Sequence, residues 1–165
     1  MNRLFTTLIT ALLIWHSQPT LAAEAGDRAP SFTLRDQTGE VRTLEEFSGK
    51  VLLLDFWASW CPPCLQSLPW LDSVQKEYEG KGFVVVAVNL DRDFSKPERF
   101  LKKLKISHLQ VLQDPTGELA NTYDVPTMPT SYLIDRTGNI VLRHKGFRSA
   151  DKETLKVQIE KVLGK

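Results

Sequence analysis

The chain has 165 residues, of which 42% are hydrophobic and 25% are charged. That length and composition predict one globular domain with a full hydrophobic core. The 21 lysines and arginines nearly balance the 20 aspartates and glutamates, so the net charge indicates neither a nucleic acid nor an acidic partner.

The first 23 residues are typical of an export signal. Arg3 gives a short positive start, and residues 4–15 form an apolar run that is short for a bilayer span. Small residues at its end offer cleavage sites, and no cysteine follows that would carry a lipoprotein anchor. We therefore expect a signal peptide over residues 1–23 and one domain over residues 24–165 in the periplasm, with an uncleaved membrane anchor as the alternative.

A small hairpin is predicted at the start of the domain. Residues 32–34 and 41–43 flank Asp36-Gln37-Thr38-Gly39, a sequence typical of a tight turn. Residues 44–47 are expected to form a short helical turn that Gly49 closes.

The only two cysteines follow an apolar run. Residues 51–54 predict a buried strand, and Cys61 and Cys64 open a helical pattern that extends to about residue 79. A Cys-x-x-Cys between a strand and a helix start is the arrangement of a redox dithiol. Cys61 falls at the helix N-terminus, where free N–H groups and the helix dipole favour a thiolate. We therefore predict Cys61 as the attacking thiol and Cys64 as the thiol that resolves the mixed disulfide.

The two residues between the cysteines bear on the direction of the reaction. Proline suits the first turn of a helix because no N–H is needed there. Pro62 and Pro63 also remove two donors that could face the Cys61 sulfur, which leaves the Cys64 N–H as the nearest. A less stabilised thiolate makes the disulfide less oxidising, so the motif favours a reductant.

Asp55 is an acid within the apolar strand. Burying a carboxylate costs free energy unless it has a partner or a task. One task is to accept the proton of Cys64 when that thiol attacks. The alternative is a carboxylate at the strand edge that bonds to backbone or water.

Other uses of the cysteine pair fit the sequence less well. A structural zinc site needs about four ligands, and the chain has no second cysteine pair. Covalent haem attachment needs a histidine after the second cysteine, where this chain has Leu65. A purely structural bridge across two residues would constrain little chain entropy.

Strands and helices alternate through the rest of the chain. The nearly continuous apolar run at residues 83–89 predicts a central parallel strand, and Pro69 should kink the helix before it. Lys102, Lys103 and Lys105 form either a solvated helix face or a docking patch. The remaining expected elements are strands at 109–112, 131–134 and 140–145 and helices at 98–105, 118–123 and 151–163.

Two motifs resemble a known family. Phe56-Trp57-Ala58 leads into Trp60-Cys61-Pro62-Pro63-Cys64, and Met128-Pro129 lies far downstream before a predicted strand. Together they resemble the thioredoxin superfamily, and within it the exported TlpA/ResA-like thiol–disulfide oxidoreductases, over residues 26–165.

This resemblance implies an α/β, thioredoxin-like fold with a central mixed sheet flanked by helices. It adds an N-terminal β-hairpin extension and an inserted helix–strand segment before Pro129. It also implies a cis Met128–Pro129 bond facing the dithiol, with Trp60 and Pro62 beside it in the substrate site.

The implied activity is reduction of disulfides in exported proteins, with apocytochromes c as one substrate class and a membrane thiol carrier as electron donor. No cofactor, metal ion or nucleic acid is expected. Two departures from the subgroup, Ser67 in place of a glutamate and Asp55 in place of an asparagine, put a narrow transfer of the cytochrome role in doubt.

Two other functions were weighed. A peroxiredoxin-like thiol peroxidase carries Thr or Ser three residues before its reactive cysteine and Pro seven before it, and neither Cys61 nor Cys64 has both. A thioredoxin-fold binding module would use the groove without turnover, and would keep its function when both cysteines are replaced by serine.

Overall fold

The computed structural model of the protein describes residues 23–164, so the predicted export signal lies outside this range apart from its last residue. The strands are β1 (Thr33–Asp36), β2 (Val41–Thr43), β3 (Val51–Trp57), β4 (Phe83–Asn89), β5 (Gln110–Gln113), β6 (Thr130–Ile134) and β7 (Ile140–Lys145). The helices are α1 (Pro62–Tyr78), α2 (Ser95–Leu104), α3 (Glu118–Thr122) and α4 (Asp151–Leu163), with 3₁₀ turns η1 (Leu44–Phe47) and η2 (Glu79–Lys81).

The strands form one mixed sheet in the order β2-β1-β5-β4-β3-β6-β7. β3 pairs in parallel with β4, and β4 with β5, while every other neighbouring pair is antiparallel. The α1 crossover between β3 and β4 accounts for their parallel pairing. The predicted mixed sheet, the N-terminal hairpin and the inserted α2–β5–α3 segment are all confirmed.

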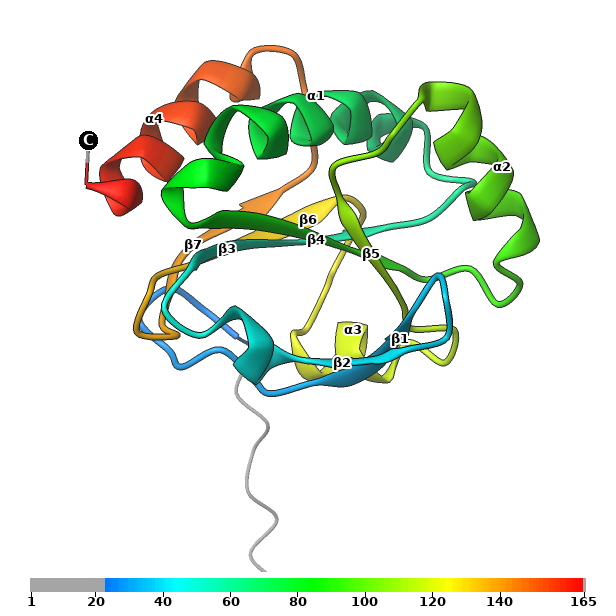
Figure 1. The fold of residues 1–165 in the computed structure, drawn as a ribbon, viewed down its shortest axis with the longest axis horizontal. Coiled ribbons are helices and arrows are strands. Elements are labelled where there is room, and N and C mark those ends of the chain that lie inside the picture. Colours follow the sequence, from blue (N-terminus) through cyan, green and yellow to red (C-terminus); the bar gives the residue numbers. More distant parts are fainter. Residues whose placement is uncertain (1–22, 165) are drawn as a thin grey trace, which may run out of the picture.

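Both faces of the sheet are covered (Figure 1). On one face Val51 and Leu53 of β3 pack among residues of α1 and α4. On the other face Leu52 and Leu54 pack among residues of α3 and of the hairpin segment. Because alternate side chains of β3 enter two cores, the whole strand is buried, which explains its unbroken apolar run.

The predicted starts differ from the structure by one residue for β1, β5 and β6 and by three residues for α2. β1 begins after Phe32, whose ring packs beside Phe47 with the ring centroids 6.3 Å apart. α2 begins three residues before the predicted Glu98. Pro97 is tolerated in its first turn because the first intrahelical bond, from the Glu98 N–H to the Phe94 carbonyl, comes after it. Pro69 lies within α1, and the kink expected there stays a prediction.

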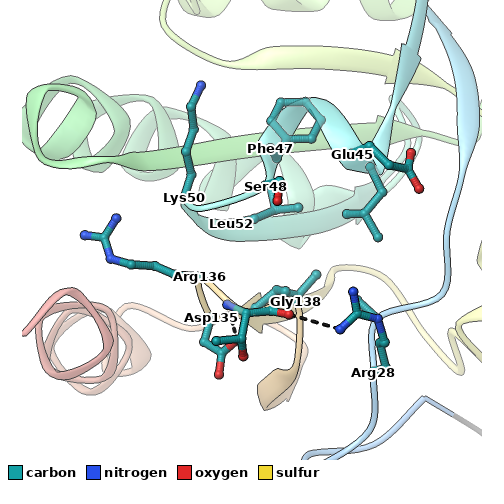
Figure 2. Close-up of a pocket in the computed structure, with 13 residues that line it drawn as sticks. Arg28, Glu45, Phe47, Ser48, Lys50, Leu52, Asp135, Arg136 and Gly138 are labelled. Atoms are coloured by element: carbon teal, nitrogen blue, oxygen red, sulfur yellow. Dashed lines mark hydrogen bonds between the residues drawn. The ribbon is translucent and has the colours of Figure 1, made fainter.

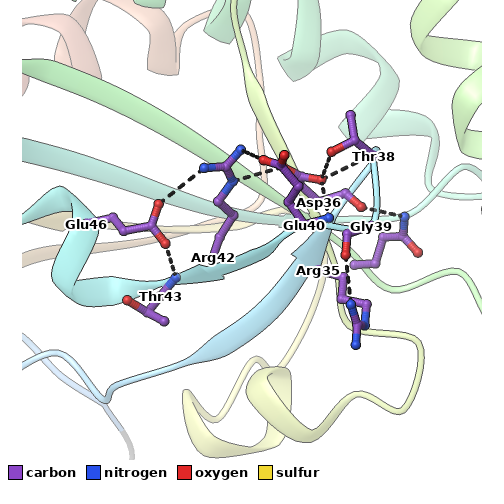
Figure 3. Close-up of polar contacts among 9 residues, drawn as sticks. Arg35, Asp36, Thr38, Gly39, Glu40, Arg42, Thr43 and Glu46 are labelled. Atoms are coloured by element: carbon purple, nitrogen blue, oxygen red, sulfur yellow. Dashed lines mark hydrogen bonds and ion pairs between the residues drawn. The ribbon is translucent and has the colours of Figure 1, made fainter.

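Polar contacts hold the β1–β2 hairpin (Figure 3). Asp36 Oδ1 accepts hydrogen bonds from the Thr38 hydroxyl at 2.6 Å and from the Thr38 and Glu40 N–H groups at 2.8 and 3.1 Å. The Arg42 guanidinium lies 2.9 Å from Asp36 Oδ2 and also contacts Glu40 and Glu46. The Thr38 hydroxyl bond, aided by Arg42, lowers the pKa of Asp36 from 3.8 to about 2.

Asp36 should therefore help the fold to resist acid. Its pKa is lower in the folded state than in the unfolded chain, so its stabilisation is present above about pH 4 and is lost as the pH falls through about 2. Denaturant unfolding at pH 5 and pH 2 should show that Asp36→Asn costs stability at pH 5 and much less at pH 2. Glu40→Gln, which removes an exposed contact with Arg42 only, serves as the control. An equal cost at both pH values would contradict the assignment.

No helix within the described range 23–164 combines the length and the apolar composition that crossing a bilayer requires.

Candidate active site

The turn between β3 and α1 is held by the end of β4. The Ser59 N–H and hydroxyl each donate to an oxygen of Asp91 at 2.7 Å, and the Asn89 side chain donates to Asp91 at 2.9 Å. These bonds hold the turn that precedes Cys61 against the residues that follow β4. Sequence reasoning missed both Ser59 and Asp91, since nothing in the local pattern shows which loop faces the turn.

Cys61 and Cys64 form a disulfide with their Cα atoms 5.3 Å apart. Cys61 is the N-cap residue of α1, and its sulfur accepts the Cys64 N–H at 3.3 Å. The Cys64 N–H is therefore confirmed as the predicted hydrogen-bond donor to the Cys61 sulfur. Cys61 retains 5% exposure and Cys64 none, so Cys61 is the sulfur nearer to solvent.

Asp55 is fully buried in β3 on the face that carries the dithiol. Its register partner on β4 is Ala87, which packs in the same cluster as both cysteines. Burial raises the pKa of Asp55 from 3.8 to about 7. Its Oδ2 has no hydrogen-bond partner among the described residues. The carboxyl therefore holds or releases a proton near neutral pH.

Ser131 is the polar contact of Asp55. It lies opposite Asp55 on β6, and its hydroxyl donates to Asp55 Oδ1 at 2.6 Å. This bond lowers the pKa of Asp55, against the larger effect of burial. Because β3 lies between β4 and β6, Asp55 is not at an edge of the sheet as the alternative supposed. Ser131 was not predicted as a site residue, since its place depends on the β3–β6 register.

The second motif lies beside the cysteines. The Met128–Pro129 bond is cis, as predicted, and Met128 packs against the cluster that holds Cys61 and Cys64. Trp60 projects into solvent with 66% exposure, and Pro62 is exposed in the first turn of α1. The structure thus brings the predicted site residues to one end of the sheet, where α1 begins (Figure 1).

Ser67 lies three residues after the second cysteine, where the family resemblance leads one to expect a glutamate. It is 1% exposed, and its hydroxyl donates to the Cys64 carbonyl at 3.0 Å. The space beneath the second cysteine therefore holds a small polar group bonded within the helix. Asp55 is the acid that the structure places on this side of the dithiol.

A separate hollow of about 130 Å³ lies away from the cysteines (Figure 2). It is lined near the start of β3 by Leu52, whereas Cys61 follows the end of that strand. Arg28 at its rim donates to the Thr137 carbonyl, and Arg136 donates to the carbonyls of Gly49 and Lys81. These cations bind backbone and tie loops together, so the hollow is not part of the dithiol site.

Comparison with known proteins agrees with this geometry. The chain matches the Redoxin family over residues 24–159. It is 34% identical over 142 residues to the thiol–disulfide oxidoreductase ResA of Bacillus thuringiensis subsp. konkukian, and the aligned region covers 86% of this chain and 78% of that protein. It is 33% identical over 148 residues to the thioredoxin-like protein YneN of Bacillus subtilis, with coverages of 88% and 85%.

A solved structure confirms the fold. The Chlorobium tepidum crystal structure assigned to thiol:disulfide interchange protein DsbE is 48% identical, with a TM-score of 0.83, and covers 87% of this chain and 100% of that one. The family match spans most of the chain and includes the strand, the disulfide and the cis-proline described above. The chain therefore belongs to the Redoxin family, among the TlpA/ResA-like thiol–disulfide oxidoreductases of the thioredoxin superfamily.

Proposed function

We propose that the protein is exported to the periplasm and reduces disulfides of exported proteins, apocytochromes c among them, through Cys61 and Cys64. The observation that carries this direction is the start of α1, where prolines occupy the first two positions. The Cys64 N–H, 3.3 Å from the Cys61 sulfur, is the remaining backbone donor there. Limited stabilisation of the Cys61 thiolate favours a dithiol that gives up its electrons.

The reaction moves two electrons in two exchanges. The Cys61 thiolate attacks one sulfur of the substrate disulfide and expels the other as a thiolate, which leaves a mixed disulfide. Cys64 then loses its proton to Asp55 and attacks the Cys61 sulfur. The substrate leaves with two reduced cysteines, and the Cys61–Cys64 disulfide is the oxidised product. A membrane thiol carrier returns the two electrons.

Substrate binding in this proposal uses the exposed surface around Cys61. The backbone of Met128 makes no hydrogen bond to another residue of the described chain, so an extended substrate segment can pair with it. Trp60 and Pro62 border the same opening from the α1 side, and Pro129 fixes the backbone direction there.

Contacts of the first described residues suggest where the signal ends. Ala23 is 3% exposed within the core, and Glu24 forms an ion pair with Arg143. Cleavage after Ala22 would keep both contacts, cleavage after Ala23 would keep only the ion pair, and cleavage after Ala25 would remove both. We therefore favour cleavage after Ala22, one residue before the predicted end of the signal.

The test is the reduction potential of the Cys61–Cys64 pair in the mature protein. We expect a value near the thioredoxin end of the range, about −270 mV, whereas about −120 mV would identify an oxidant and overturn the proposal. Pro63→Ala restores one N–H in the first turn of α1 and should raise the potential by about 30 mV, the equivalent of one hydrogen bond to a thiolate. Pro69→Ala, farther along α1, should leave the potential unchanged.

A further inference from the structure

A groove lies between the turn before Cys61 and α2. It has a volume of about 420 Å³, and Ser59, Trp60 and Asp91 line one side of it. The other side is formed by α2, and Figure 1 shows that helix at the same end of the sheet as the start of α1. Trp60 directly precedes Cys61 in the chain, so this wall of the groove is one residue away from the attacking cysteine. The residues that α2 contributes are Lys96, Arg99, Phe100 and Lys103.

The groove carries an excess of positive charge. Within the described residues, none of Lys96, Arg99 and Lys103 forms an ion pair. Asp91 is the one acid in the lining, and both of its oxygens already accept bonds that hold the turn. Three cations and one carboxylate therefore line the groove, although the whole chain is nearly neutral. Asp93, which lies outside the lining, also interacts electrostatically with Lys96 and Arg99, and counting it still leaves the cations in excess.

The groove also offers apolar surface. Trp60 is 66% exposed, and Phe100 is partly buried on the opposite wall. An exposed tryptophan beside cations that form no ion pair suits a ligand that combines an apolar side chain with carboxylates. Of the three lysines that the sequence left open between a solvated face and a docking patch, Lys103 lines the groove, whereas Lys102 is paired with Glu98 at 2.8 Å and does not.

We propose that this groove binds the acidic, apolar segment that flanks the attacked disulfide in the substrate protein. The inference rests on the proposed function, because Trp60, which lines the groove, adjoins the cysteine that a substrate disulfide must reach. Charge complementarity at such a surface speeds association and selects among partners. The protein therefore prefers disulfides with aspartate or glutamate and an apolar residue near the cysteine.

Two disulfide-bonded peptides that differ only in charge test this preference. One carries Glu-Phe-Glu and the other Lys-Phe-Lys, both a few residues from the cysteine. We expect reduced mature protein to act on the acidic peptide with about tenfold higher kcat/KM at low salt, and 0.5 M NaCl to remove most of the difference. Each rate is divided by the rate of the same protein with the neutral 2-hydroxyethyl disulfide.

The variant Lys96→Glu/Lys103→Glu should invert this preference. Lys102→Glu is the matched control, because it reverses a charge on the same helix outside the groove and should leave the preference unchanged. Equal rates for the two peptides, or an equal effect of the control variant, would overturn the inference. Equal rates for the two peptides, together with binding to phosphatidylglycerol vesicles that the groove variant abolishes, would also overturn the inference, because the groove would then be a membrane contact.

The small disulfide separates this inference from the proposed function. If neither the peptides nor 2-hydroxyethyl disulfide is reduced, the proposed function fails. If the small disulfide is reduced and the charge preference is missing, only the docking inference fails.

Discussion

Cys61→Ser is expected to abolish disulfide exchange, because it removes the sulfur that starts the reaction. Cys64→Ser should instead stop the reaction halfway and accumulate a mixed disulfide between Cys61 and the substrate. The reason is structural: Cys61 caps α1 and retains exposure, whereas Cys64 is fully buried one turn later. Non-reducing electrophoresis and mass spectrometry of the trapped species would identify the bonded cysteine.

The two serine variants also test the roles assigned to the two cysteines and the alternative of a binding module. Trapping that requires Cys64 and survives Cys61→Ser would reverse the assignment of roles. A double serine variant that keeps full activity in the cell would indicate a binding module without turnover. Serine replaces each sulfur with a similarly small group, so loss of exchange in a variant with an unchanged unfolding transition reports chemistry rather than misfolding.

Asp55→Asn should slow release of the substrate from the mixed disulfide by about a hundredfold, with little effect on the first attack. The change keeps the shape of the side chain and the acceptor for the Ser131 hydroxyl, but removes the exchangeable proton. Single-turnover kinetics across pH would show the resolution rate of the native protein changing near pH 7, where Asp55 titrates in the oxidised form. A resolution rate that is the same in both proteins at every pH would reject the proton-carrier role.

Two further variants test whether Asp55 is the group that causes the pH dependence of the resolution rate. Ser131→Ala removes a bond that lowers the pKa of Asp55, so the pH dependence should move to higher pH. His144 lies opposite Ser131 on β7, one strand farther from Asp55. His144→Gln should leave the profile in place, because the Nε2 atom of that histidine lies 3.6 Å from Asp151 and not against the Asp55 carboxyl.

The same carboxyl should weaken the oxidised fold at neutral pH. The pKa of Asp55 is about 7 in the folded state against 3.8 ordinarily, so the unfolded chain releases the proton first. Stability therefore falls as the pH rises from about 4 to about 7, and the loss is complete above that range. At about 1.4 kcal/mol per pKa unit, Asp55→Asn should gain up to about 4 kcal/mol at pH 8 and little at pH 4. Denaturant unfolding at the two pH values measures the difference, and a loss of stability at pH 8 would show a carboxylate held by specific bonds.

The sequence predicted those parts of the site that depend on local pattern. The apolar run of β3, the helix start at Pro62 and the spacing of the cysteines are readable along the chain, because each is set by neighbouring residues. Ser131 and Asp91 were missed, because their roles depend on strand register and on a loop contact across the sheet. The cationic groove was also not predictable from the net charge, because a sum over the whole chain cannot show which charged side chains lie close together in the fold.

The N-terminal hairpin has a consequence for self-association. Without β1, strand β5 would be the outermost strand of the sheet, with a free row of N–H and C=O groups. Such an edge is a template for pairing with another chain. The hairpin moves the boundary to β2, a strand of three residues that carries Arg42 in its middle. A short, charged edge resists strand addition, so the extension protects this side of the sheet, while β7 forms the opposite edge.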